Sequence, residues 1–420
     1  MNQFLRELFT LLNAGYQYAV LRNYEDLPDK NSSRDIDLLI LRDDLRRFRK
    51  LLPDFAKRNG CRILYVNEDN QFFTVVLVSD AYEVFQLDFQ HNFAWMGIDL
   101  LDEREVLKRR IFNGTLYHLP PDLTFLPKYL YCRILGAPYP AKYADVRKDA
   151  FAYNSEYLET ILRAISIGGD SAYWDKANKW ILRFRSFISA LFHRPWRAVA
   201  FMTEFLCRYW LDIFRRRGLM ISFSGPDGCG KTTVIEMVRE RLAVNTPVLF
   251  HFRPTLLPNL GEAAHKAKVI KEVDRNFDKP HRAKRKGVLN SLIRLSYYST
   301  DYIIGYFIKI LPIRQRKHIV FFDRYFTDVI VDSERSSIFL NFKFIAFLRH
   351  FIPGCKCNFL FYVKPETIRS RKQELEIEDM ERIYSRLDYL SSKRGYYKID
   401  NNGTPEEAVR QILDILLKEK

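Results

Sequence analysis

One stretch of this chain decides its fold: Gly225-Pro226-Asp227-Gly228-Cys229-Gly230-Lys231-Thr232. It fits the pattern G-x-x-x-x-G-K-[ST]. The apolar run 219–223 before it predicts a buried strand, and residues 233–238 after it open a helical pattern. A loop between a strand and a helix points its backbone N–H groups at one spot, and the helix N-terminus adds partial positive charge there. The sequence therefore predicts a loop that binds phosphate.

Each residue type in this loop has a chemical reason. Glycines let the backbone approach a phosphate closely. We expect Lys231 to reach the β- and γ-phosphates of a nucleoside triphosphate and the Thr232 hydroxyl to hold Mg²⁺. The predicted ligands are ATP and Mg²⁺, and the predicted nucleotide-binding residues are Gly225, Gly228, Gly230, Lys231, Thr232 and Thr233.

Composition limits the class of protein. A chain of 420 residues with 47% hydrophobic content folds into two or three domains. The net charge of +16 favours anionic partners. Six scattered cysteines indicate free thiols in a reducing compartment, so we expect a cytoplasmic protein. The N-terminus does not resemble a signal peptide, and no uncharged apolar run is long enough to predict a spanning helix.

The pattern of apolar residues divides the chain into three parts. Residues 1–120 mix helix and strand, which predicts an α+β domain with a largely antiparallel sheet. Residues 121–217 predict a helical, basic-aromatic connector. Residues 218–420 alternate strands and helices, which predicts an α/β domain with a parallel sheet and helices on both faces.

The connector alternates apolar bulk with arginine from Trp180 to Arg217. An amphipathic helix usually faces a core, so we favour a linker whose apolar face packs between two domains. Peripheral contact with an anionic membrane, at its inner surface in a bacterium, is the alternative.

An aspartate and an arginine follow another predicted strand in the C-terminal part. The apolar run 318–322 ends at Asp323-Arg324-Tyr325. In parallel α/β sheets the carboxyl ends of the strands carry the chemistry. We expect Asp323 to assist Mg²⁺ or a substrate and Arg324 to clamp a phosphate.

Together these residues resemble the thymidylate kinase family, over residues 218 to the end. The resemblance implies that Asp227 faces the acceptor, that Arg253 in Phe252-Arg253-Pro254 contacts the acceptor phosphate, and that Tyr325 lies at the substrate. It also implies a mobile lid after 364–368, whose Arg371 and Lys372 close over the transferred group. Asp227, Lys231, Asp323, Arg324 and Arg371 are the expected catalytic residues.

The chain departs from that family where the base of a nucleotide would be held. Residues 326–335 lack the residues that contact thymine, and a site without hydrogen-bond partners discriminates a base poorly. This segment is similar instead to thymidylate kinase-like proteins encoded with bacterial surface-polysaccharide genes, in which an acid and an arginine follow, as Asp332 and Arg335 do here. That resemblance implies a sugar, glycan or lipid-linked glycan acceptor, with Arg335 among its contacts.

The N-terminal part contains a second candidate site. In Asp35-Ile36-Asp37 two carboxylates at i and i+2 on a predicted strand point to one side, where they repel unless a cation lies between them. Carboxylate oxygens suit Mg²⁺. Asp88, on another predicted strand, is the candidate third metal ligand.

This arrangement resembles the nucleotidyltransferase fold shared with DNA polymerase beta. The chain departs from it at Arg22-Asn23, where the family has a Gly-Ser turn. Two alternatives stay open: a working transferase, or a retained fold that binds a glycan or nucleotide without catalysis.

The sequence thus favours an ATP-dependent kinase acting on a surface-polysaccharide precursor, with a second, nucleotidyltransferase-like site. The alternatives are a thymidylate-type nucleoside monophosphate kinase with an accessory domain, and a nucleic-acid-binding or toxin-type regulator. Expected partners are a nucleoside triphosphate and an anionic or glycan acceptor. We expect no specific nucleic acid, because the arginines do not mark a recognition helix; a homodimer stays open.

Overall fold

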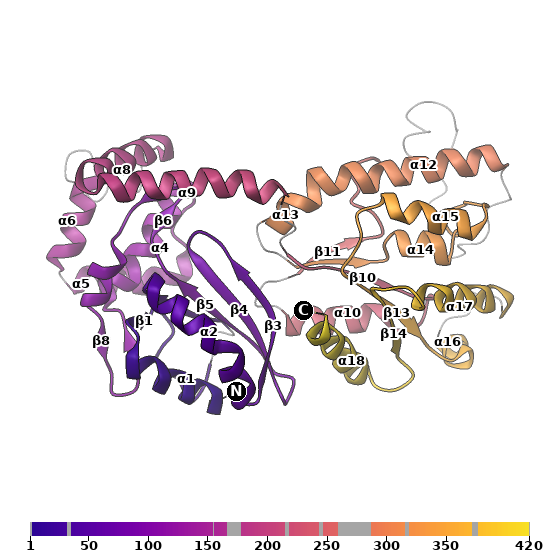
Figure 1. The fold of residues 1–420 in the computed structure, drawn as a ribbon, viewed down its shortest axis with the longest axis horizontal. Coiled ribbons are helices and arrows are strands. Elements are labelled where there is room, and N and C mark those ends of the chain that lie inside the picture. The colour runs from indigo at the N-terminus through magenta and orange to yellow at the C-terminus, as the bar shows by residue number, and fades with distance from the viewer. Residues whose placement is uncertain are drawn as a thin grey trace. The chain divides into compact units, whose positions relative to one another are not determined.

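The computed structural model describes residues 2–31, 35–153, 155–165, 178–214, 218–242, 247–258, 287–315, 319–371 and 377–419. The chain divides into two compact units, Met1–Arg215 and Arg216–Lys420 (Figure 1). The helices between residues 121 and 214 fall within the first unit. None of the described helices combines the length and the apolar character that crossing a bilayer requires.

The first unit opens with the elements that build its main sheet. They are α1 (Asn2–Gly15), β1 (Tyr18–Val20), β2 (Asp35–Ile40), α2 (Arg42–Arg58), β3 (Cys61–Glu68), β4 (Phe72–Ser79) and β5 (Val84–Gln90). Short strands and helices follow: β6 (Ala94–Trp95), β7 (Ile98–Asp99), α3 (Glu103–Lys108), β8 (Ile111–Phe112), β9 (Tyr117–His118), α4 (Pro121–Leu135), η1 (Ala141–Tyr143), α5 (Ala144–Ala152), α6 (Glu156–Ile165), α8 (Lys179–His193) and α9 (Pro195–Phe214).

The main sheet of the first unit is mixed. Its described strands lie in the order β3-β4-β5-β2-β1-β9-β8. Most neighbouring pairs are antiparallel, as the sequence predicted, but β2 pairs with β5 and β1 pairs with β9 in parallel. The β2–β5 pair is important for function because it places Asp37 directly opposite Asp88.

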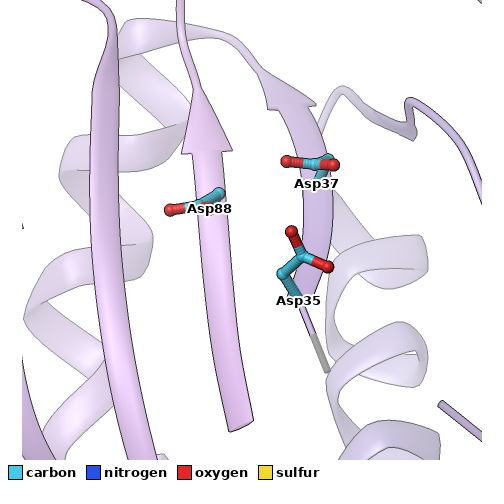
Figure 2. A group of neighbouring side chains, drawn as sticks. All are labelled: Asp35, Asp37 and Asp88. Atoms are coloured by element: carbon cyan, nitrogen blue, oxygen red, sulfur yellow. The ribbon is translucent and has the colours of Figure 1, made fainter. Parts of the chain in front are cut away.

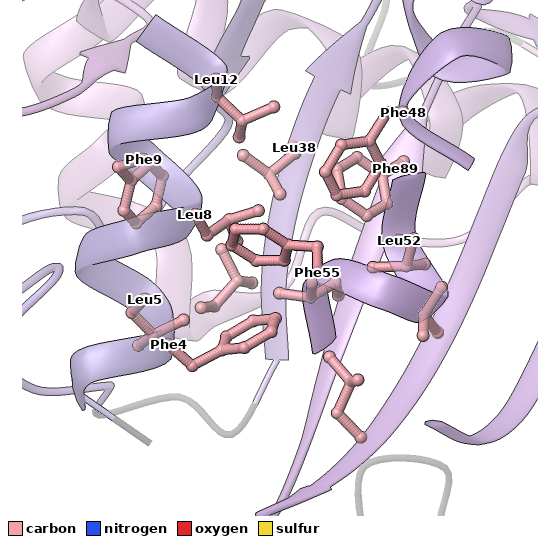
Figure 3. Packing of buried hydrophobic residues seen from close by; sticks show 14 of the residues in the cluster. Phe4, Leu5, Leu8, Phe9, Leu12, Leu38, Phe48, Leu52, Phe55 and Phe89 are labelled. Carbon is pink, nitrogen blue, oxygen red and sulfur yellow. The ribbon is translucent and has the colours of Figure 1, made fainter. Parts of the chain in front are cut away.

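Helices α1 and α2 cover one face of this sheet (Figure 3). Apolar residues recur every three or four positions in α1, so they form one stripe that is buried: Phe4, Leu5, Leu8, Phe9 and Leu12. Phe48, Leu52 and Phe55 of α2 pack into the same cluster as Leu38 and Phe89 of the sheet. This packing holds β2 and β5, and therefore their aspartates, against a rigid layer.

The second unit alternates strands and helices. Its described elements are β10 (Met220–Ser224), α10 (Lys231–Arg241), β11 (Val248–His251), α12 (Val288–Gly305), η3 (Tyr306–Ile310), α13 (Leu311–Gln315), β12 (Val320–Asp323), α14 (Phe326–Val331), α15 (Phe342–Leu348), η4 (Arg349–Phe351), β13 (Cys357–Tyr362), α16 (Pro365–Arg371), α17 (Ile377–Ser391), β14 (Tyr396–Asp400) and α18 (Pro405–Lys418).

The sheet of the second unit is parallel throughout its described strands, in the order β11-β12-β10-β13-β14. Figure 1 shows α12 and α14 on one side of it and α10 and α18 on the other. Alternation along β10 explains this, because Met220 packs in the cluster that contains α12 and α14, while the ring of Phe223 faces Phe359 and Phe361. The predicted α/β class, a parallel sheet with helices on both faces, is confirmed.

Candidate functional sites

The predicted phosphate loop lies at the carboxyl end of β10, the central strand of the parallel sheet. Two of its glycines are required by geometry. A Cβ on Gly225 would lie 3.0 Å from the Phe361 Cβ, and Gly230 has a left-handed φ of 82° at the N-terminus of α10. The loop therefore turns tightly between strand and helix, as phosphate binding at a helix N-terminus requires.

Lys231 is buried and lies across the loop that precedes it. Its Nζ donates to the carbonyl oxygens of Gly225 at 2.7 Å and Pro226 at 2.8 Å. Thr232 and Thr233 are exposed in the first turn of α10. The lysine charge and the two threonines thus lie at the start of α10, where the first backbone N–H groups of a helix have no intrahelical partner. A hydroxyl oxygen open to solvent there fits Mg²⁺ bound together with a phosphate.

Asp227 is held by two arginines. Arg324 and Arg335 each donate to one of its carboxylate oxygens. Burial raises the pKa of Asp227, but the attraction of Arg324 and Arg335 outweighs burial and lowers the pKa to about 2. The structure therefore brings Asp227, Arg324 and Arg335 together at the loop, with two guanidinium groups facing one carboxylate.

Arg324 adopts an uncommon backbone conformation. Its φ is 70°, in the left-handed region that non-glycine residues rarely occupy. Its N–H donates to the Phe223 carbonyl at 2.9 Å, which ties the turn after β12 to β10. Strained residues of this kind concentrate at functional sites. Here the strain directs a guanidinium toward the phosphate loop.

Asp323 ends β12 beside the loop strand. Its Oδ2 lies 3.2 Å from the Nδ1 of His251, which ends β11. Its buried Oδ1 has no hydrogen-bond partner among the described residues. A carboxylate oxygen without a donor is available to a cation or to a substrate hydroxyl, which fits either role expected of Asp323.

Other predicted residues of the second unit have different surroundings. Arg253 is 4% exposed and donates to Asp301, which is fully buried, at 2.9 Å. Tyr325 lies in the core and its hydroxyl donates to the Pro353 carbonyl at 2.6 Å. The structure thus shows protein partners for both residues, and the acceptor contacts that the family resemblance implied stay a prediction.

The two predicted lid residues lie where the described part of α16 ends. Arg371 is the last residue of α16, and Lys372 lies outside the described residues.

Sequence reasoning missed several buried polar groups near the loop. Asp328 is buried and accepts a hydrogen bond from the Ser224 hydroxyl at 3.2 Å. Burial raises the pKa of Asp328 to about 6, although Arg324 lowers it. Asn401 donates to the Cys229 carbonyl at 2.7 Å. Asp328 follows Arg324 closely in a helix, which was a usable signal, but nothing in the spacing of Asn401 or Asp301 indicates their partners.

The first unit contains a cluster of three carboxylates (Figure 2). Figure 2 shows Asp35 and Asp37 on one strand and Asp88 on its neighbour. One oxygen from each of the three lies within 4.8 Å of the others. The parallel register of β2 and β5 produces this arrangement, because Asp37 pairs with Asp88 and Asp35 with Gln86.

Neighbouring groups hold Asp88 in place. Its two oxygens accept hydrogen bonds from the Thr74 hydroxyl and the Gln86 amide. Burial and the negative charge of Asp37 raise the pKa of Asp88 to about 6, against the lowering effect of these hydrogen bonds. Burial, followed by Asp37, also raises the pKa of Asp35. The cluster therefore has excess negative charge, which a hard divalent cation with oxygen ligands such as Mg²⁺ would offset.

Arg22 supplies part of that charge from the protein itself. Its Nε donates to the Asp37 Oδ2 at 2.6 Å. Arg22 also lines a cavity of about 160 Å³ together with Tyr24, Lys128, Tyr139 and Tyr143. Arg22 therefore connects the carboxylates to a pocket whose walls carry aromatic rings and charged groups of both signs, Glu25 and Asp149 among them.

Comparisons with known proteins find a similarity to solved structures alone. No family model matches it, and no curated protein does. A solved structure of thymidylate kinase from Ehrlichia chaffeensis is similar at 17% sequence identity with a TM-score of 0.32. The similarity covers 48% of this chain and 99% of that one. At this TM-score the similarity does not establish a shared fold.

Proposed function

We propose that the second unit is an ATP-dependent phosphotransferase. The observation that carries the proposal is the loop after β10, where Lys231, two exposed threonines and the N-terminus of α10 surround one turn. Arg324 and Arg335 add two positive charges at the same place. This combination suits a polyphosphate and a phosphoryl group in transfer.

Each residue has a role in the proposed reaction. Lys231 and the loop N–H groups bind the β- and γ-phosphates, and Thr232, with Asp323, would hold Mg²⁺, which offsets charge on the phosphates. Arg324 and Arg335 release Asp227 and bind the phosphoryl group instead. Asp227 then orients the acceptor hydroxyl and accepts its proton, while the hydroxyl oxygen bonds to the γ-phosphorus and the bond to the leaving ADP breaks. Arg371 and Lys372 complete the lid that the family resemblance implies.

We propose a sugar, glycan or lipid-linked glycan precursor of a bacterial surface polysaccharide as the acceptor. Two observations support an acceptor other than a nucleoside monophosphate. Residues 326–335 lack the base contacts of thymidylate kinases. In addition, Arg253, the residue expected on an acceptor phosphate, is buried against Asp301. ATP and the free cysteines fit a reaction in the cytoplasm.

The test is transfer of label from γ-labelled ATP to a panel of nucleotides, sugars and glycan fragments. We expect label on a glycan-type acceptor, no transfer by Lys231→Ala, and full transfer by Lys343→Ala, which removes an exposed lysine of the same unit. Rapid labelling of thymidylate would favour the nucleoside monophosphate kinase. Failure of the wild type to bind ATP would overturn the proposal.

We propose nucleotidyl transfer as a second activity, carried by Asp35, Asp37 and Asp88 in the first unit. Their mutual distances fit a divalent cation. The test is transfer of label from α-labelled nucleoside triphosphates with Mg²⁺ or Mn²⁺. We expect Asp35→Asn to abolish transfer and Asp145→Asn, on an exposed helix, to leave it unchanged. Unchanged transfer in Asp35→Asn would assign the activity elsewhere.

A further inference from the structure

Helix α8 is apolar on two opposite sides. Leu182, Ser186 and Ala190 recur every four residues and are buried, with Leu182 in the core of the first unit. Trp180, Phe184 and Phe192 lie on the other side and are exposed, Phe192 by 81%. Packing against the described residues of the first unit therefore accounts for one face of α8 and leaves the aromatic one exposed to solvent.

Helix α9 continues this pattern. Trp196 is 87% exposed and Trp210 is 66% exposed, and Val199, Leu206 and Leu211 are exposed with them. At 3.6 residues per turn these positions lie on one side of the helix. Helix α8 packs against α9, and we call these residues, with Trp180, Phe184 and Phe192, the aromatic face. So many bulky apolar side chains left exposed on two neighbouring helices mark a site of interaction.

The other side of α9 is fixed to the first unit by charge. Arg197 donates to Asp99 at 2.8 Å and also to Glu103. The Asp99 side chain is fully buried, so this ion pair is shielded from water. The aromatic face is thus presented by a helix held on its opposite side.

Positive charge borders the aromatic face. Lys179 and Arg183 place their cations 5.8 Å and 4.6 Å from the ring centre of Trp180. Helix α8 contains no acidic residue. On α9, Glu204 is already paired with Arg42 and Arg208. The face therefore combines tryptophan and phenylalanine rings with cations beside Trp180.

We propose that the aromatic face docks on the surface of an anionic lipid bilayer. Tryptophan rings favour the interfacial layer, where an apolar ring and a polar N–H are both satisfied, and lysine and arginine beside them attract anionic headgroups. The net charge of +16 adds long-range attraction to such a surface. A second copy of this chain is a less suitable occupant, because the cations bordering the two faces would repel each other.

The experiment measures co-sedimentation of the full chain with phosphatidylcholine vesicles, with and without phosphatidylglycerol. We expect binding to the vesicles that contain phosphatidylglycerol, weakened by salt, and a blue shift of tryptophan emission on binding. The double variant Trp196→Ser and Trp210→Ser should lose roughly tenfold or more in the partition coefficient. The matched control is Phe347→Ser with Phe351→Ser, which removes two exposed aromatic rings from the second unit.

A charge variant separates the two parts of the proposal. Lys179→Glu should weaken binding to phosphatidylglycerol vesicles and reduce the dependence of the remaining binding on salt. Three results would overturn the proposal: no binding of the wild type to either vesicle, equal binding by the tryptophan variant, or a concentration-dependent dimer that the tryptophan variant abolishes without any vesicle binding. None of these measurements depends on nucleotide, so they stand apart from the proposed kinase activity.

Discussion

At the scale of single residues, the charges of this protein depend on which partner a buried group has. Asp227 keeps a pKa of about 2 because Arg324 and Arg335 outweigh its burial, whereas Asp88, beside Asp37, is raised to about 6. Two aspartates of one chain thus differ in protonation near pH 5. Asp227 stays negatively charged at that pH, whereas a bound cation would favour the deprotonated form of Asp88.

The raised pKa of Asp88 makes both metal binding and stability depend on pH. Between about pH 4 and about pH 6 the folded state binds more protons than the unfolded state, because Asp88 is protonated only in the folded state. The free energy of unfolding of the metal-free protein therefore falls as the pH rises through that window. A divalent cation binds the deprotonated form. We therefore expect Mn²⁺ to raise the melting temperature at about pH 7.5 and much less at about pH 5.

The matched variants for this metal effect are Asp88→Asn and Asp145→Asn. The first removes a ligand and should abolish the Mn²⁺-dependent shift, while the second changes an exposed aspartate and should keep it. An equal shift at both pH values, measured by calorimetry, would contradict the role of Asp88.

The buried pair of Arg253 and Asp301 has its own prediction. Asp301 also accepts from the N–H groups of Leu256 and Leu257, so Asp301→Asn weakens both a buried ion pair and a loop anchor. We expect the free energy of unfolding to fall by about 3 kcal/mol. Asp379→Asn, which breaks a more exposed pair with Arg382, should cost about 0.5 kcal/mol. Denaturant unfolding compares the two.

The same measurement addresses the role of Arg253. If Arg253 serves the acceptor instead of the fold, Arg253→Met would raise the KM for the acceptor and leave the unfolding midpoint where it is.

At the scale of elements, helix α2 tests how the first unit is held together. Phe48 is buried between α2 and the sheet, while Leu51 of the same helix is 45% exposed. We expect Phe48→Ala to lower the free energy of unfolding by about 3–5 kcal/mol through the cavity it leaves. Leu51→Ala should change it by about 0.5 kcal/mol or less. Similar losses for both variants, measured by denaturant unfolding, would show that α2 does not pack as described.

Sequence periodicity was sufficient for the elements with strong apolar patterns. The apolar spacing of residues 4–14 and 43–58 predicts helices, which correspond to α1 and α2, and the apolar run 357–363 predicts a strand, which corresponds to β13. Strand β14 was not predicted, because Tyr396–Asp400 contains a lysine and an aspartate. This strand lies at the edge of the sheet, where an apolar pattern is weak. Helix α12 was not predicted either, since its apolar residues face both core and solvent.

For the sites too, residues adjacent in the sequence could be predicted, whereas residues brought together by folding could not. The phosphate loop and Asp35-Ile36-Asp37 are contiguous, so their spacing alone indicates a ligand. The partner of Arg253 lies 48 residues along the chain, and the Thr74 hydroxyl reaches Asp88 through the sheet register. Pairings of that kind arise from tertiary packing, which one sequence does not encode in its spacing.

At the scale of the whole molecule, the two compact units each have their own core and their own candidate ligand site. We expect two unfolding transitions in calorimetry. ATP with Mg²⁺ should raise the transition of the second unit by mass action, and Lys231→Ala should abolish that increase. Asp88→Asn should change only the transition of the first unit, because the two sites share no residue. A single transition that responds to both variants would contradict two separate cores.

The strand orders of the two sheets also bear on the time each unit needs to form. In the first, β3, β4 and β5 are neighbours both along the chain and in space, so they can pair as soon as they are synthesised. In the second, β10 has β12 and β13 as neighbours, so its pairing waits until Val320, which pairs with Met220, has been synthesised. Contacts between distant residues form slowly, and synthesis delivers the N-terminal unit first. When half of the chain has been synthesised, all strands of the carboxylate cluster are thus present in the nascent chain, while the phosphate loop has not yet been synthesised.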